Sequence, residues 1–416
     1  MNCIKVFKVG GSVLKTPADF MKIARGICSG GRKYRVCLVT SAMKNATNRL
    51  IKRFLNAVPQ PCFWDFERFA GFGEIEASLL FESTFHSLGV KSQAVLPWMK
   101  EWPLFISLKN PQRLSGEKVN EKRDFRILKK THTKIKQYIF PLFKDLDVII
   151  IPGFIAKDGR GRIVTLGRGG SDISALLFSE LLKARELILI KESSGILNLD
   201  PRLYHRAEKI SSLNAAELGL LASSGAQVLN PISLKHQRSL KKMKVTDIRR
   251  RTGTEIYFGR EITVKFSNTP YSVLTFVGNK IPETPGLLSR ISSLLARHDI
   301  SIYSITVSDN LIALYVEEER GEDAYRLLSP VLKKSKNLKF LNLKKQIGKI
   351  LVRSYKFINE PGIIKKIVSP IAKEGINIWE VLTAHTDVMI FVEYRDLRKT
   401  YRVICNFFKR QKSYNK

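Results

Sequence analysis

The sequence is short of acidic residues and contains no long apolar run. Of its 416 residues, 71 are Lys or Arg and only 37 are Asp or Glu, so the formal net charge at pH 7 is +34. No apolar run approaches the roughly 18 residues that a membrane-spanning helix needs. The opening segment reaches Gly10 and Gly11 before the core of a signal peptide could form. We therefore expect a cytoplasmic protein.

Cysteine is scarce, and its spacing argues against two further classes of protein. Zinc sites and disulfide frameworks rely on closely paired cysteines. None of the five cysteines belongs to a CxxC pair, so we expect reduced thiols and no bound metal. They are Cys3, Cys28, Cys37, Cys62 and Cys405. With 44% hydrophobic and 26% charged residues, the composition is that of a folded protein.

The strong positive charge is not accompanied by a known nucleic-acid-binding motif. Such a charge attracts polyanions. The basic residues are nevertheless spread along the whole chain, and no RRM, KH or zinc-finger signature is present. We do not expect nucleic-acid binding, because attraction of small anionic substrates explains the charge equally well. Walker A and GxGxxG patterns are also absent, which argues against a P-loop or dinucleotide-binding fold.

The first half of the chain alternates short apolar runs with helical patterns. The runs are continuous, which is typical of a parallel sheet covered by helices on both faces. We predict strands at residues 4–8, 36–41, 92–96, 147–156 and 187–190, and helices at 17–27 and 48–58. Ligands bind such sheets at the carboxyl ends of the strands. Two glycine clusters follow predicted strands, at residues 10–11 and 167–170, so the functional site is expected there.

The second half contains an internal repeat. Residues 284–302 (TPGLLSRISSLLARHDISI) and 360–378 (EPGIIKKIVSPIAKEGINI) share seven identical residues at equivalent positions. In each copy a Pro-Gly turn opens an amphipathic helix that is followed by an apolar strand, which predicts two copies of a small α+β module. We place the domains at residues 1–258 and 259–416, with repeats at about 270–340 and 345–416.

The segment TLGRGGSD at residues 165–172 leads into a predicted helix at 173–182. Glycine lets the backbone approach a ligand, and the free N–H groups of the first helical turn point at it. Arg168 adds a cation, so the segment suits a carboxylate or a phosphate. The alternative is a structural turn capped by Ser171 or Asp172, with Arg168 in solvent.

The segment KVGGS at residues 8–12 ends the first predicted strand. Lys8 lies close to Gly10 and Gly11, which places a mobile cation over bare backbone. That arrangement suits a phosphoryl group in transfer. The alternative is an exposed lysine at the end of a strand.

These two segments, together with four others and the repeat, resemble the aspartate kinases of the amino-acid kinase superfamily. The similar segments are KVGGS at 8–12, VTSAMKNATN at 39–48, GFGEIEASLLF at 71–81, IPGFIAKDGRGRIVTLGRGGSD at 151–172, GILNLDPR at 195–202 and SSGAQVLNP at 223–231. The repeat is similar to paired ACT modules, which bind amino-acid effectors. The resemblance implies an α/β fold, with an open, mostly parallel sheet sandwiched by helices and followed by two α+β ACT-like modules.

The resemblance implies phosphorylation of the β-carboxylate of L-aspartate to 4-phospho-L-aspartate, the first step towards lysine, threonine and methionine. ATP with Mg²⁺ is the implied co-substrate, without a prosthetic group, and a homo-oligomer with an amino-acid effector is expected. The nucleophile is a carboxylate with a solution pKa of about 3.9, so no general base is needed at pH 7. The site must instead surround the phosphoryl group with positive charge and backbone donors.

The resemblance also implies roles for single residues. Lys8 would span the nucleotide and the acceptor as a catalytic residue, and Asp172 would order it. The implied substrate-binding residues are Thr47, Glu74, Arg168 and Ser171. The implied nucleotide-binding residues are Lys8, Gly10, Gly11, Ser12, Lys191, Glu192, Leu197, Arg202 and Gln227. The alternative for Glu74 and Asp172 is a helix cap favoured by the helix dipole, and for Thr47 a turn residue.

Several departures from the family pattern fall on the nucleotide side. Lys191 and Glu192 stand where the family has Thr and Asp, and Leu197 replaces a tyrosine. Gln227 replaces a phosphate-facing lysine, and we hypothesise that Lys191 restores the lost charge. On the acceptor side, Asn45 stands where a glycine is usual.

The first repeat also departs from the family pattern. Tyr303 stands where an aspartate would pair with the ammonium group of an effector. A neutral phenol cannot form that ion pair, so we expect weak or absent inhibition by lysine. The candidate effector contacts are Pro285, Gly286, Ser308 and Asn310. The alternative is a dimerisation platform without a ligand.

Two other functions fit the same residues. One is a kinase of this fold for another acidic acceptor, although the C-terminal repeat argues for aspartate. The other is a catalytically weakened paralogue that senses amino acids or binds a partner. The changes at Lys191, Glu192 and Gln227 favour it, whereas Lys8 and Asp172 argue against it.

Overall fold

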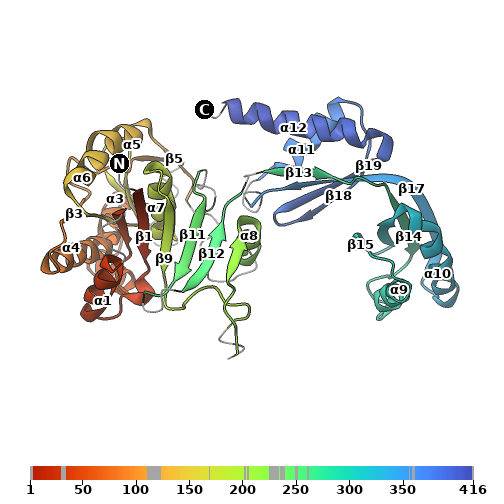
Figure 1. Cartoon of the computed structure of the whole chain (residues 1–416), viewed down its shortest axis with the longest axis horizontal. Helices are drawn as coiled ribbons and strands as arrows, with labels where there is room; N and C mark the ends of the chain where they lie inside the picture. The colour runs from red at the N-terminus through yellow and green to blue at the C-terminus, as the bar shows by residue number, and fades with distance from the viewer. Residues whose placement is uncertain are drawn as a thin grey trace. The chain divides into compact units, whose positions relative to one another are not determined.

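The computed structural model describes most of the chain, in two compact units (Figure 1). The described residues are 3–29, 34–109, 123–167, 169–200, 203, 206–223, 234, 239–248, 252–259, 262–355, 357 and 361–414. The first unit is Met1–Glu261 and the second is Ile262–Lys416. No helix within these described ranges is long and apolar enough to cross a membrane.

The first unit is built on an eight-stranded sheet with the strand order β10-β12-β11-β9-β1-β2-β6-β3. The strands are β1 (Cys3–Val9), β2 (Tyr34–Thr40), β3 (Ser92–Ala94), β6 (Val148–Pro152), β9 (Glu186–Ile190), β10 (Ser212–Asn214), β11 (Lys242–Thr246) and β12 (Gly253–Tyr257). All neighbours are parallel except β11 and β12. The expected open, mostly parallel sheet is therefore confirmed. Most residues of its central strands are apolar and buried, which requires cover on both faces of the sheet.

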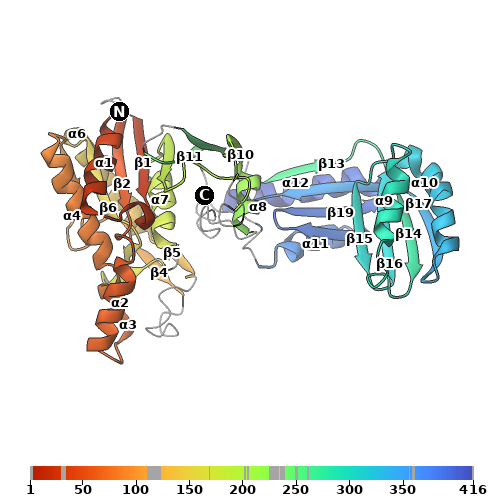
Figure 2. The ribbon, with the colours of Figure 1, turned by 90° about the horizontal axis from the view of Figure 1, so that it is seen from below.

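Helices supply that cover. They are α1 (Pro17–Cys28), α2 (Ala46–Ala57), α3 (Phe63–Ala70), α4 (Phe72–Ser87), α5 (Lys129–Lys134), a π-helical turn (Ile135–Ile139), α6 (Phe140–Asp145), α7 (Gly170–Leu181) and α8 (Ala215–Ser223). The helices α1 and α4 cover one face of the strands β1 and β2, and α7 covers the opposite face (Figure 2). Phe20 of α1 packs on Phe81 of α4, with ring centroids 4.7 Å apart. The predicted helices at 17–27, 48–58 and 173–182 are confirmed within about two residues, except that α7 begins three residues early.

The single strand predicted at 147–156 is wrong. The structure ends β6 at Pro152 and begins β7 (Ile155–Lys157) in a separate hairpin with β8 (Ile163–Thr165). The Gly153 amide donates to the Thr40 carbonyl at 2.9 Å, and a Cβ on Gly153 would lie only 2.7 Å from that oxygen. The next residue, Phe154, has a positive φ of 67°. This close approach turns the chain out of the sheet, which an apolar pattern does not reveal.

The second unit is a seven-stranded antiparallel sheet with two pairs of helices. Its order is β15-β16-β14-β17-β19-β18, with β13 beside β17. The elements are β13 (Thr263–Phe266), β14 (Tyr271–Gly278), α9 (Leu287–Ala296), β15 (Ser304–Ser308), β16 (Leu311–Glu317), α10 (Gly321–Lys334), β17 (Leu338–Arg353), α11 (Ile363–Lys373), β18 (Ile378–Ala384), β19 (Asp387–Glu393) and α12 (Leu397–Tyr414). The two α+β modules are confirmed. Each equivalent helix follows a glycine in the left-handed region, Gly286 with φ 78° and Gly362 with φ 77°.

The two modules share one strand, which the repeat did not indicate. The 16-residue strand β17 pairs with β14 through its first part and with β19 and β13 through its second. The rings of Tyr315 and Phe391, one from each module, stack with centroids 3.9 Å apart. Glu380 of β18 accepts a hydrogen bond from Thr306 of β15 at 2.6 Å and another from the Tyr315 hydroxyl. These contacts bring the two end strands of the sheet together.

A buried ion pair in the first unit holds the chain just before the second glycine cluster. The side chains of Glu67 on α3 and Arg123 are 0% and 2% exposed. Arg123 donates to both carboxylate oxygens of Glu67 and, at 3.0 Å, to the Thr165 carbonyl. The Thr165 amide donates to Glu67 at 2.6 Å. The pair therefore fixes the end of β8, two residues before Gly167.

We expect Glu67→Leu to lower the free energy of unfolding of the first unit by about 3–5 kcal/mol, because Arg123 is left buried without a counter-charge. The matched control is the double variant Glu67→Leu with Arg123→Met, which removes both charges and should recover most of the loss. Urea unfolding followed by circular dichroism measures both. A double variant no more stable than the single one would contradict this account.

Candidate active site

Lys8 and Asp172 form a nearly buried ion pair at the carboxyl end of β1. The Lys8 Nζ lies 2.8 Å from Asp172 Oδ1, and the side chains are 10% and 14% exposed. Lys8 is the penultimate residue of β1, and Asp172 lies in the first turn of α7. The two glycine clusters predicted from the sequence are thus neighbours in space. Lys8 is not the exposed strand-end lysine of the alternative interpretation.

The glycines after β1 leave open backbone beneath the Lys8 ammonium group. A Cβ on Gly10 would lie 3.4 Å from Lys8 Nζ and 3.8 Å from Ser12 Oγ. A Cβ on Gly11 would lie 2.6 Å from the Ala42 carbonyl oxygen, so no side chain fits there. The Gly10 amide donates to the Ile190 carbonyl at 3.4 Å, which ties the turn to the end of β9.

Lys191 adds a second lysine to this cluster. It follows β9 directly, and its amide donates to the Thr246 carbonyl at 2.9 Å. Burial lowers the pKa of Lys191, Asp172 raises it, and Lys8 lowers it again, so the three charges interact. Two lysines therefore face one carboxylate, and the cluster has an excess positive charge that suits a phosphate.

A cavity of about 540 Å³ lies beside this cluster, on the side where nucleotide contacts were expected. Lys191, Glu192 and Leu197 all line it, as do Lys15 and Asp19, which the sequence analysis missed. Glu192 pairs with Lys15 at 2.6 Å, with both side chains about half exposed. No motif marks Lys15. Asp19 carries a local signal, because it closes the capping box with Thr16 at the start of α1.

Glu74 lies in the first turn of α4 and is 4% exposed. Burial raises its pKa to about 8, while hydrogen bonds from the amides of Ala42 and Glu74 and the charge of Lys8 pull it down. Its Oε2 has no hydrogen-bond partner among the described residues. A buried carboxyl with a vacant acceptor can take up a cationic group, which would favour its ionised form.

The loop before α2 packs against the start of α4. A Cβ on Gly73 would lie 2.7 Å from Ala42 Cβ and 3.5 Å from Leu50 Cδ1, so the segment that carries Thr47 passes close to Glu74. Asn45, which stands in place of the usual glycine, has φ 63°. This departure has a physical reason, because asparagine tolerates the left-handed conformation better than most residues.

The remaining predicted site residues fall into two groups. Ser171 lies in the first turn of α7, two residues after Gly169, which caps the helix with φ 76°. A Cβ on Gly153 would lie 3.0 Å from the Ser171 Cβ, so β6 and α7 meet closely there. Arg168, Arg202 and Gln227 lie outside the described residues.

Two of the candidate effector contacts, Pro285 and Gly286, directly precede α9, whereas Ser308 ends β15 and Asn310 precedes β16. The Ile281 amide donates to the Asp309 carbonyl at 3.1 Å, and the Gly278 amide donates to the Asn310 carbonyl at 3.0 Å. These bonds hold the segment that precedes the Pro285–Gly286 turn against the turn between β15 and β16. Tyr303 is 40% exposed, and its hydroxyl donates to Glu317. Weak inhibition by lysine stays a prediction.

The described residues contain no group of three or more His, Cys, Asp or Glu side chains arranged to hold a metal ion. The charged groups at the end of β1 are instead arranged to receive an anion. The Mg²⁺ that accompanies ATP stays a prediction.

Comparison with known proteins agrees with this geometry. Residues 4–247, more than half of the chain, match the amino acid kinase family, and residues 343–406 match the ACT domain. An aspartokinase of Thermus thermophilus is 23% identical over 425 residues, which cover 98% of this chain and 99% of the relative. The expected resemblance is confirmed.

Two solved structures share the fold. The aspartate kinase of Synechocystis has a TM-score of 0.67 at 22% identity and covers 98% of this chain and 69% of that one. The aspartokinase III of E. coli in complex with aspartate and ADP has a TM-score of 0.53 at 20% identity, covering 97% and 99%. At these identities the likeness concerns the fold.

We expect Glu74→Gln to change how stability depends on pH. The folded-state pKa of Glu74, about 8, lies above the ordinary value of 4.5, so the native state holds the proton more tightly than the unfolded state. This contribution to stability is full below pH 4.5 and is lost as the pH rises to 8. The wild type should therefore lose a few kcal/mol relative to the variant across that range.

Thermal and urea unfolding between pH 4.5 and 9 measure this difference. The matched control is Glu76→Gln on the exposed side of the same helix, which should leave the pH profile unchanged. Parallel profiles for the wild type and Glu74→Gln would contradict the assignment.

Proposed function

The chain belongs to the amino acid kinase family, and on that premise we propose that its first unit transfers the γ-phosphoryl group of ATP to the β-carboxylate of L-aspartate. The observation that carries the proposal is the buried Lys8–Asp172 pair at the carboxyl end of β1, beside open glycine backbone and a cavity. The match to an aspartokinase over nearly the whole chain supports aspartate as the acceptor. The product is 4-phospho-L-aspartate, which opens the route to lysine, threonine and methionine.

The transfer needs no proton movement within the protein. A β-carboxylate oxygen of aspartate attacks the γ-phosphorus, the bond from that phosphorus to the bridging oxygen breaks, and the electron pair leaves on ADP. The main barrier is the approach of two anions. Lys8 offsets charge on the phosphoryl group, and Asp172 holds the Lys8 ammonium in position at 2.8 Å. The Gly11 amide adds a donor, whereas the Gly10 amide is already bonded to Ile190.

Separate groups hold the two substrates. The Glu74 carboxylate binds the ammonium group of aspartate, and the vacancy at its Oε2 supports that role. Ser171 and Arg168 bind the α-carboxylate, and Thr47 adds a hydroxyl contact. On the nucleotide side, Lys191 faces the phosphates, while Glu192 and Leu197 line the cavity for the rest of ATP.

We expect Lys8→Ala to lower aspartate-dependent ADP release from Mg-ATP by at least about 100-fold, because a preorganised cation is lost from the transferring group. The matched control is Lys5→Ala on the same strand. Lys5 pairs with Glu186 at 3.1 Å and takes no part in the site, so this variant should stay active.

The acceptor is varied in the same assay, with L-aspartate, L-glutamate and no acceptor. Aspartate-dependent turnover that disappears in Lys8→Ala supports the proposal. Turnover with glutamate alone would move the assignment to a kinase for another acidic acceptor. Folded protein without turnover on any acceptor would overturn the proposal in favour of an amino-acid-sensing paralogue.

We expect Lys191→Ala to raise the apparent KM for ATP by about tenfold or more, because the cation that compensates for Gln227 is lost. The matched variant is Lys191→Arg. Since the pKa of Lys191 is lowered, the wild type should lose ATP affinity at alkaline pH, whereas arginine stays charged and should not. An unchanged KM in Lys191→Ala, measured across pH 7 to 10, would contradict the role of Lys191.

A further inference from the structure

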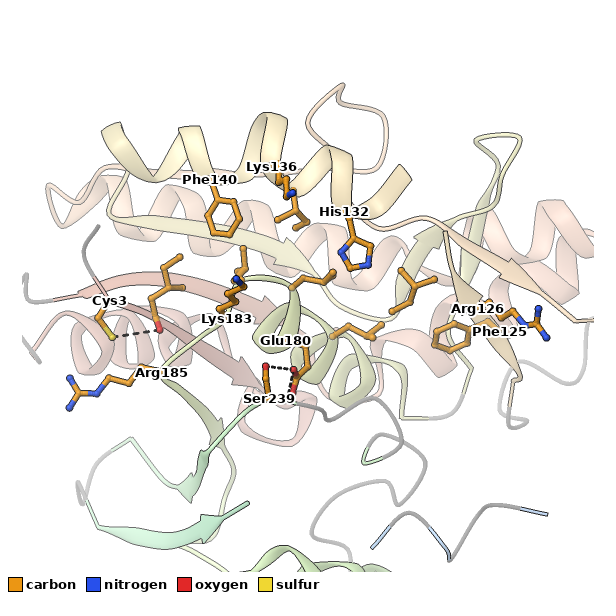
Figure 3. A pocket seen from close by; sticks show the side chains of 16 residues that line it. Cys3, Phe125, Arg126, His132, Lys136, Phe140, Glu180, Lys183, Arg185 and Ser239 are labelled. Atoms are coloured by element: carbon orange, nitrogen blue, oxygen red, sulfur yellow. Dashed lines mark hydrogen bonds between the residues drawn. The ribbon is translucent and has the colours of Figure 1, made fainter. Parts of the chain in front are cut away.

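The first unit has a second cavity, of about 1030 Å³, that contains none of the proposed site residues (Figure 3). It lies at the other ends of the same two elements that carry the Lys8–Asp172 pair. Cys3 and Ile4, which line it, begin β1, whereas Lys8 lies near the end of that strand. Leu181 ends α7, whereas Asp172 lies in its first turn. Leu181 lies nine positions after Asp172 along the helix, a rise of about 13.5 Å.

The cavity has an apolar body. Its walls are the last turns of α7, the helical segment from α5 to α6, and β5 (Phe125–Ile127). Phe140 and His132 extend from the helical segment towards the hollow (Figure 3). Ile135, Leu177 and Leu182 are buried in the wall, whereas Ile4, Ile127, Phe140 and Leu181 are half-buried. Apolar side chains that remain half-exposed around a hollow of this size can cover the apolar part of a small ligand.

The rim of the cavity is strongly basic. Five exposed cationic or ionisable side chains lie on it: Arg126, His132, Lys136, Lys183 and Arg185. Within the described part of the chain, none of the five forms an ion pair. The acid on the lining is Glu180, whose two carboxylate oxygens accept hydrogen bonds from Ser239 and the Leu240 amide. The lysines and arginines of this set outnumber the Glu180 carboxylate, so the net charge around the hollow is positive.

Lys183 occupies a backbone position that usually belongs to glycine. It has φ 50° and directly follows the last turn of α7, where a left-handed glycine commonly ends a helix. A lysine here is strained, yet it places an ammonium group at the mouth of the cavity. The ammonium group of Lys183 therefore contributes to the positive charge around the hollow.

We propose that this cavity binds a small anionic ligand with an apolar body, such as an aryl or acyl carboxylate or phosphate. The apolar part packs on Ile127, Phe140 and Leu181, and the anionic group lies between Lys183 and Lys136. The site is distinct from the one that binds ATP and aspartate, so the ligand binds at the same time as these substrates.

The test uses the full chain and two probes of similar shape. 8-Anilinonaphthalene-1-sulfonate is anionic, and N-phenyl-1-naphthylamine is its neutral counterpart. Calorimetry and probe fluorescence are measured with saturating Mg-ATP present. We expect one equivalent of the anionic probe to bind and the neutral probe to bind at least about tenfold more weakly.

The variant Lys183→Gly with Lys136→Gln should weaken binding of the anionic probe at least about tenfold. Glycine suits the end of α7, so this change should leave folding intact, which circular dichroism verifies. The matched control is Lys129→Gln, an exposed lysine of α5 outside the cavity, which should bind as the wild type does.

Several results would overturn the proposal. They are the absence of stoichiometric binding, equal affinity for both probes, unchanged affinity in the double variant, and displacement of the probe by Mg-ATP. Concentration-dependent self-association that blocks the probe would assign the hollow to a contact between copies of the chain.

Discussion

The ion pair between Lys8 and Asp172 is the interaction on which the arrangement of the first unit depends. The charges of Lys8 and Lys191 repel each other, and the carboxylate of Asp172 offsets that repulsion by attracting both. Asp172 provides that carboxylate from the first turn of α7, where a negative charge is also favoured by the helix dipole. One charge thus fixes β1, the loop after β9 and α7 around the same point, and leaves a net positive charge for a phosphoryl group.

Glu74 differs from this pair, because it is a buried carboxyl whose Oε2 has no hydrogen-bond partner among the described residues. Its raised pKa means that the folded protein holds a proton there at neutral pH. An arriving ammonium group would supply the missing partner and release that proton, so acceptor binding and ionisation of Glu74 are coupled. In the proposed function, this carboxyl would stay without its full set of partners until the ammonium group of aspartate binds.

Much of this architecture could be predicted from the sequence, and the failures share a physical cause. Continuous apolar runs predicted the buried strands, and the glycine clusters predicted the ends of β1 and the start of α7. The break between β6 and β7 was missed because it depends on the approach of Gly153 to Thr40, a contact between distant segments. The pairing of Lys15 with Glu192 was missed for the same reason. Local patterns predict elements, whereas these contacts arise only when the elements pack.

The strand β17, which the two modules of the second unit share, couples the conformations of these modules. Two modules with separate sheets could bind ligands independently. Here β17 belongs to both, and Glu380 bonds with Thr306 and Tyr315 across to the other end of the sheet. A shift of β15 or β18 must therefore strain either that carboxylate's hydrogen bonds or the strand between them. Packed cores switch between discrete arrangements more readily than they deform gradually. The two modules are therefore coupled, and a ligand bound to either module would change the conformation of both.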